Sequence, residues 1–231
     1  VPDGVPRFGD LLDKKGYLPK NKSNPLLAAQ AAARMAEQVE KMTKGTVEGN
    51  LEAVLKPRPW IEAGKDKGEP EYATAAQAAN HLAEIFAAGL VNNPRIAQDT
   101  DIRRAMMAFQ IYASQTLKRA GTELEQVGEK AVGKAIKDAR EPLHGVSKVG
   151  VISEYANTSS LLEDMEKGLK KLGLPAEAMP LINQRLQQAK GMEHKGLPMP
   201  AFLRSAQHVD VGGWAKRVNS QSQNHSTPKR G

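Results

Sequence analysis

The sequence of 231 residues contains no cysteine, and aromatic residues make up only 4% of it. The absence of cysteine excludes disulfides, thiolate catalysis and cysteine-based metal sites. No apolar run approaches the roughly 18–20 residues of a membrane span. The first residues show no basic segment followed by an apolar stretch, so the sequence predicts neither a membrane segment nor a signal peptide.

The sequence also lacks complete forms of the short motifs that mark common active sites. No Gly-x-Ser-x-Gly and no Gly-x-Gly-x-x-Gly is present, and we expect no phosphate-binding Gly-x-x-x-x-Gly-Lys loop. His81 and Glu84 have an i,i+3 spacing that could serve a metal, but such sites need further carboxylates on facing helices. We therefore interpret Gln77, Asn80, His81 and Glu84 as a solvated polar helix face. We expect no enzymatic activity, metal, cofactor or small-molecule substrate.

Charge is distributed unevenly along the chain, whose net charge is +7. Residues 25–190 contain 22 basic and 21 acidic side chains, whereas residues 1–24 contain five and three, and residues 191–231 contain six and two. The two ends are also rich in Pro and Gly, which favours extended chain. This pattern predicts an N-terminal arm (1–24), a helical body (25–190) with a candidate linker at 57–70, and a C-terminal arm with a basic tail (191–231).

Apolar periodicity and helix-capping residues predict an all-α body in the form of a single helical bundle. Expected helices span residues 25–45, 48–56, 71–88, 99–120, 122–140, 160–171 and 180–190. Gly89 and Gly121 are expected to end helices, and capping boxes are expected at Thr122 and Ser160. Gly121, Gly128 and Gly133 lie in or beside expected helices, where we expect them to permit close packing and not to hold phosphate. The helix over 99–120 is apolar on both sides, which is typical of a central element. Residues 143–157 are compatible with either a short strand or a packed loop.

Several basic residues form patterns that suit phosphate binding. Lys130, Lys134 and Lys137 lie on one helix stripe, and each such contact with a phosphate releases counterions. Glutamates precede this stripe, so an alternative is a solvated helix that complements its own dipole. The candidate nucleic-acid-binding residues are Arg103, Arg104, Lys118, Arg119, Lys130, Lys134, Lys137, Lys216 and Arg217.

The two arms carry few apolar side chains that could anchor them. Ordering a residue costs about 1–2 kcal/mol in backbone entropy, and the polar tail has little apolar area to offset that cost. We therefore expect residues 1–24 and 208–231 to dock on neighbouring subunits. The candidate subunit contacts are Phe8, Leu11, Leu12, Tyr17 and Trp214.

The layout of a near-neutral helical body with two basic arms resembles that of many viral coat proteins and nucleoproteins. This is a likeness of architecture and transfers no residue roles. It favours a structural subunit that polymerises with itself and packages nucleic acid, expected to be single-stranded RNA, in a virion or the host cytoplasm. The alternative is a helical effector, scaffold or phage-injected protein that binds a protein partner.

Overall fold

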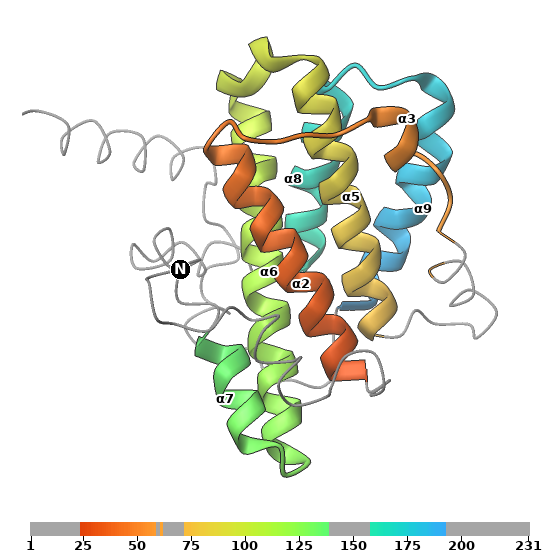
Figure 1. The fold of residues 1–231 in the computed structure, drawn as a ribbon. Coiled ribbons are helices and arrows are strands. Elements are labelled where there is room, and N and C mark those ends of the chain that lie inside the picture. The colour runs from red at the N-terminus through yellow and green to blue at the C-terminus, as the bar shows by residue number, and fades with distance from the viewer. Residues whose placement is uncertain (1–23, 59–60, 62–71, 139–157, 193–231) are drawn as a thin grey trace, which may run out of the picture.

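The computed structural model describes residues 24–58, 61, 72–138 and 158–192, and it is all-α over these residues, as predicted (Figure 1). The predicted arms and residues 143–157 lie outside the described residues, apart from the helix ends at residues 24, 191 and 192. The α-helices are α2 (Asn24–Thr43), α3 (Leu51–Val54), α5 (Tyr72–Asn92), α6 (Thr100–Gln126), α7 (Lys130–Asp138), α8 (Thr158–Lys171) and α9 (Met179–Ala189). Short 3-10 turns are η2 (Pro94–Gln98), η6 (Ala176–Ala178) and η7 (Lys190–Met192).

The long helices form one bundle. Helix α6 packs against α2, α7 and α8, while α5 packs against α2 and α9. Helices α2 and α5 begin at the lower end of Figure 1, and α9 with η7 ends there. At this same end, the last turns of α6 and the whole of α7 form an antiparallel hairpin that projects beyond the bundle. We call this the hairpin end.

Helix α5 is the most enclosed element among the described residues. Seventeen of its 21 residues are buried, and many of these are alanines. Alanine adds little apolar area, but it lets neighbouring helices approach closely. Larger side chains fill the remaining space: the rings of Phe86 and Phe109 lie 5.5 Å apart between centroids. The sequence predicted the helix over 99–120 as central, and the structure divides that role between α5 and α6.

Two glycines predicted to end helices lie within them instead. A Cβ atom on Gly121 would lie 2.7 Å from the carbonyl oxygen of Gly133, and one on Gly89 would lie 2.9 Å from the Leu172 Cδ1 atom. Each glycine therefore marks a close approach between elements. Thr122 does not cap a new helix, because its hydroxyl donates to the Lys118 carbonyl oxygen at 2.9 Å within α6.

Other helix ends follow from local chemistry. The Asp99 carboxylate caps α6 by accepting from the backbone N–H groups of Asp101 at 2.8 Å and Ile102 at 3.3 Å. Gly128, between α6 and α7, has a φ of +93°, and Gly173, after α8, has a φ of +67°. Glycine adopts this left-handed region without steric cost. Helix α8 begins at Thr158, two residues before the predicted start at Ser160.

Candidate nucleic-acid interface and a buried polar cluster

The α6–α7 hairpin positions the predicted basic stripe. Val132 and Ile136 are buried, and the backbones of α6 and α7 meet at Gly121 and Gly133. The hydrophobic side of α7 is thereby covered. Its outer side carries Lys130 and Lys134, both exposed. Residues four apart on a helix have Cβ atoms about 5–6 Å apart, so these two ammonium groups form a short cationic row.

Two of the predicted basic residues are engaged within the fold. Arg119 forms an ion pair with Glu123 at 2.9 Å, and its guanidinium carbon lies 4.0 Å from the centroid of the Tyr72 ring. Lys137 crosses from α7 to α6 and pairs with Glu125 at 2.5 Å. Both side chains stabilise the hairpin and its base, and both are committed to acidic partners.

Three of the predicted nucleic-acid-binding residues on the hairpin remain available for contact with a phosphate. Lys118, Lys130 and Lys134 are exposed, and none has an acidic partner within ion-pair distance in the part of the chain that the structure describes. A lysine without an intramolecular partner loses no ion pair when it binds a phosphate. These three residues are therefore the strongest candidates for contact with a polyanion.

The remaining described candidates lie at the opposite end of α6. Arg103 and Lys118 are 15 residues apart, which corresponds to about 22 Å along a helix axis. Arg103 is exposed and donates to the Gln98 side chain, while Arg104 is half-buried with its Nε atom enclosed by protein. The structure therefore does not bring all the predicted basic residues into one surface. Lys216, Arg217 and the five predicted subunit contacts lie outside the described residues.

Residues 128–134 read Gly-x-x-x-x-Gly-Lys, as in a phosphate-binding loop, but Ala135 stands where that motif requires Ser or Thr. Such a loop connects a strand to a helix, whereas Gly128 here connects two helices and Gly133 lies within α7. Gly133 instead permits the contact with α6, because a Cβ atom there would lie 2.5 Å from the Gly121 carbonyl oxygen. The segment is therefore not a nucleotide cradle.

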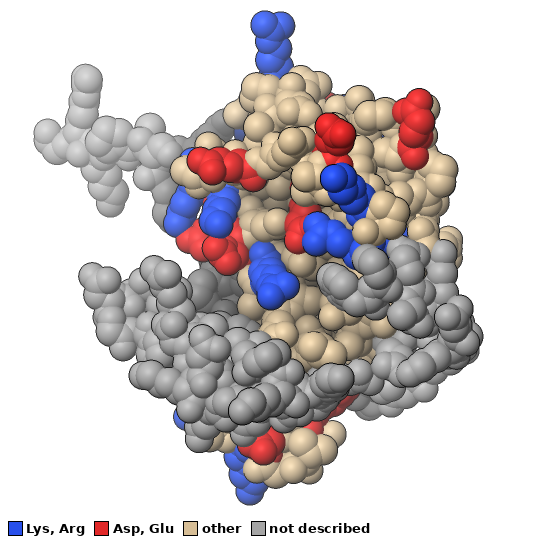
Figure 2. All heavy atoms as spheres, turned by 45° about the vertical axis from the view of Figure 1, so that its right-hand side comes forward, with Lys and Arg blue, Asp and Glu red and all other residues tan. Residues whose placement is uncertain are grey.

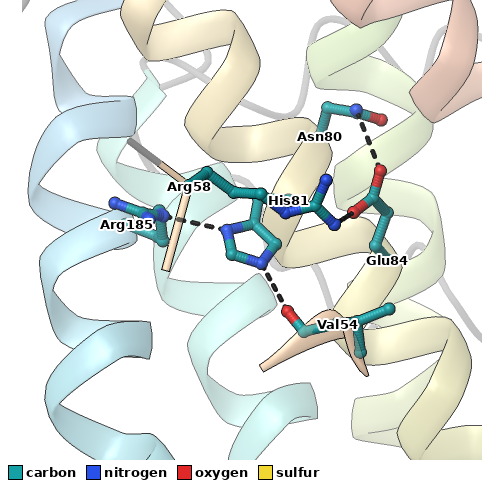
Figure 3. Close-up of polar contacts among 6 residues, drawn as sticks. All are labelled: Val54, Arg58, Asn80, His81, Glu84 and Arg185. Atoms are coloured by element: carbon teal, nitrogen blue, oxygen red, sulfur yellow. Dashed lines mark hydrogen bonds and ion pairs between the residues drawn. The ribbon is translucent and has the colours of Figure 1, made fainter. Parts of the chain in front are cut away.

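A second group of polar side chains lies between α5, α9 and residues of α3 and the segment after it (Figure 3). His81 is 2% exposed and uses both ring nitrogens: Nε2 contacts the Val54 carbonyl oxygen at 2.5 Å, and Nδ1 accepts from Arg185 Nε at 2.9 Å. A carbonyl only accepts and a guanidinium only donates. This geometry requires the neutral tautomer of His81, with its proton on Nε2.

Arg185 extends this cluster toward Ile61. The arginine is fully buried and donates to the Gln188 side-chain oxygen at 2.8 Å. Gln188 in turn donates to the Ile61 carbonyl oxygen at 3.3 Å. These contacts join α9 to α5 and to the segment after α3, so we assign the cluster a structural role.

Glu84 lies at the edge of the same cluster, with partners different from those of His81. Arg58 forms an ion pair with it at 2.6 Å, and the Asn80 amide donates to it at 3.4 Å. Burial raises the pKa of Glu84 above its ordinary value, although Arg58, Arg34 and Asn80 act in the opposite direction. Within the described residues, no three His, Cys, Asp or Glu side chains lie together as a metal site.

The sequence interpretation of this polar stripe as a solvated face is wrong, because Asn80 and His81 are both buried. Sequence reasoning also missed Arg185. The available signal was its place on helix α9, where Ile182, Leu186 and Ala189 flank it at positions i−3, i+1 and i+4 and are all buried. A charged residue on an apolar helix face indicates a buried polar partner.

Charge on the visible body is mixed. On the face drawn in Figure 2, Lys and Arg side chains alternate with Asp and Glu over the upper body and form no large single-sign patch. None of the described helices combines the length and the apolar character that crossing a membrane would require. No protein-family model, no curated protein and no solved structure matches this chain.

Proposed function

We propose that this chain is a non-enzymatic structural subunit that binds single-stranded RNA and packages it in an assembly built through its arms. The expected setting is a virion or the host cytoplasm. One observation carries the proposal: the projecting hairpin presents three exposed lysines without acidic partners among the described residues, Lys118, Lys130 and Lys134. The neighbouring cations Arg119 and Lys137 are held in ion pairs.

The chemistry of this surface suits a sequence-independent polyanion. Each lysine that contacts a phosphate releases condensed counterions, which gives affinity without base recognition. The ammonium groups on α7 are spaced by one helical turn and stand on a hairpin whose apolar side is already buried. The basic residues of the two arms, which account for most of the net charge, add to the same attraction.

The test is the salt dependence of binding to a fluorescent oligo(U), measured by anisotropy. Replacing Lys118, Lys130 and Lys134 with Ala removes three phosphate contacts. The slope of log affinity against log salt should become less steep by about 2, since each contact to a single strand contributes about 0.7. Circular dichroism should show unchanged helicity, because alanine is a good helix former.

A matched control removes three charges from the other half of the body. Lys56, Arg95 and Lys167 are exposed and have no acidic partner among the described residues. Replacing them with Ala lowers the net charge equally and should leave the slope nearly unchanged. Equal effects of the two triple variants would mean that net charge, and not the hairpin surface, governs binding. No binding by the wild-type chain would refute the proposed function.

A protein-binding scaffold is the second candidate, favoured by the outer face of α9. Pro180, Asn183 and Gln187 are exposed there, and the one charged residue of the helix, Arg185, is buried. Depletion of charge is typical of the centre of a protein interface. Size-exclusion chromatography with the absorbance ratio at 260 and 280 nm distinguishes a packaging subunit from a protein-binding scaffold. Large particles rich in nucleic acid support packaging, and a clean monomer or small oligomer supports the scaffold.

A further inference from the structure

Both ends of the described chain lie at the end of the bundle from which the α6–α7 hairpin projects. Helix α2 begins at this end of the bundle, and η7, whose last residue is Met192, finishes there (Figure 1). The two described ends of the chain, which adjoin residues 1–23 and 193–231, therefore both lie at the hairpin end. The first segment contains five basic and three acidic residues, and the second contains six and two.

Direct contacts fix the exit of the C-terminal segment to α6. The Arg119 guanidinium donates to the Met192 carbonyl oxygen at 3.1 Å, and the Tyr112 hydroxyl donates to the Ala189 carbonyl oxygen at 3.1 Å. The Tyr72 hydroxyl donates to the Thr116 carbonyl oxygen at 2.7 Å, which holds the start of α5 at the same level of α6. Arg119 directly follows Lys118 in α6, so the end of η7 at Met192 is held at the level of Lys118.

Lys190 stands at this exit and was not among the residues predicted from the sequence. It opens η7, is exposed, and has no acidic partner among the described residues. Several cations of the opposite half differ in this respect: Lys171 pairs with Asp99 at 3.2 Å and with Asp101 at 3.4 Å, and Lys44 pairs with Glu40. Exposed cations without an acidic partner among the described residues occur in both halves, as Lys56, Arg95 and Lys167 show, so its position at the tail exit and not an excess of charge singles out Lys190.

We infer that Lys190 joins Lys118, Lys130 and Lys134 in one phosphate-binding surface, so that RNA lies across the hairpin end of the subunit and the opposite end faces away from it. This inference rests on the proposed function and adds both a residue and an orientation to it. Arg119 acts as a positioning residue. It holds Met192, where the C-terminal segment leaves the body, at the level of Lys118, and its own ion pair with Glu123 keeps it from binding phosphate.

Lysine acetylation followed by mass spectrometry tests the orientation on the full-length chain, with and without oligo(U). Lys118, Lys130, Lys134 and Lys190 should lose reactivity in the complex, while Lys56 and Lys167 should keep it. In parallel, Lys190→Ala should reduce the steepness of the salt slope by about 0.7. Lys167→Ala, which also removes an exposed charge without an acidic partner among the described residues, should leave the slope unchanged.

The outcomes separate the inference from the function on which it depends. If oligo(U) binds and protects the hairpin lysines while Lys190 stays reactive, or if Lys190→Ala behaves like Lys167→Ala, the inference is overturned and the proposed function stands. Protection of Lys56 and Lys167 would also overturn it, since RNA would then cover the opposite half. If the wild-type chain does not bind oligo(U), both fall together.

Discussion

Glu84 shows how a single side chain links the buried polar cluster to stability. Burial raises its pKa even though the Arg58 guanidinium lies 2.6 Å away. A group with a higher pKa in the folded than in the unfolded state binds its proton preferentially in the folded state. Ionisation of Glu84 therefore opposes folding, and the unfolding free energy falls as pH rises from the ordinary value of 4.5 through the raised one.

Replacing Glu84 with Gln should remove this pH dependence. The amide keeps an acceptor for Arg58, which is about one-third exposed and can be hydrated. The variant should be at least as stable as the wild type at neutral pH, and its unfolding free energy should vary less between about pH 4 and 7. Urea unfolding across this range measures the difference, with Glu52→Gln on the exposed face of α3 as the control. A clear loss of stability at neutral pH would show that the ion pair outweighs the cost of burial.

Helices are the elements that the sequence predicted best, because periodicity and caps are local signals. The start of α2 at Asn24, the Asp99 cap and the end of α8 before Gly173 all follow from residues close in sequence. The prediction that Gly89 and Gly121 end helices is wrong, because the residues that they approach, Leu172 and Gly133, are distant or across a turn. The expectation that Gly121 and Gly133 permit close packing is confirmed. A glycine that ends a helix and one that admits a neighbouring helix look alike until the packing is known.

Gly168 tests this packing role in helix α8. A Cβ atom there would lie 2.2 Å from the Ala105 Cβ atom and 3.0 Å from the Phe86 ring. Gly168→Ala should therefore destabilise the fold by about 1–3 kcal/mol through overpacking, although alanine favours a helix by about 1 kcal/mol. Denaturant unfolding measures the change. Lys167→Ala, at the exposed neighbouring position, should change stability by less than about 0.5 kcal/mol. Similar stability of the two variants would mean that α8 and α6 separate without cost.

At the scale of the whole molecule, the sequence predicted the stripe on α7 but not which end of the bundle it occupies. Lys130 and Lys134 share a face by helical spacing alone, whereas the end of the bundle at which Lys190 lies depends on how α9 packs along α5. Arg103 lies in the same helix as Lys118 yet at the far end of the body. Spacing along the sequence predicts which residues share a face of one helix, whereas the packing of the helices determines which of those faces lie at the same end of the bundle.

Removing both arms tests whether assembly depends on them. The described helices share one core of buried apolar side chains that extends from Leu26 to Met192, and we expect this core to let residues 24–192 retain a helical fold by circular dichroism. The deletion takes away five and six basic residues together with the predicted contacts Phe8, Leu11, Leu12, Tyr17 and Trp214. We expect a soluble body that forms no large particles by light scattering. As a control, the same five residues are changed to Ser in the full-length chain. This variant keeps the charge of the arms, so any loss of assembly comes from the missing apolar contacts. If the truncated chain forms the same particles as the intact one, the contacts between subunits lie on the helices, with the uncharged face of α9 as the first surface to test.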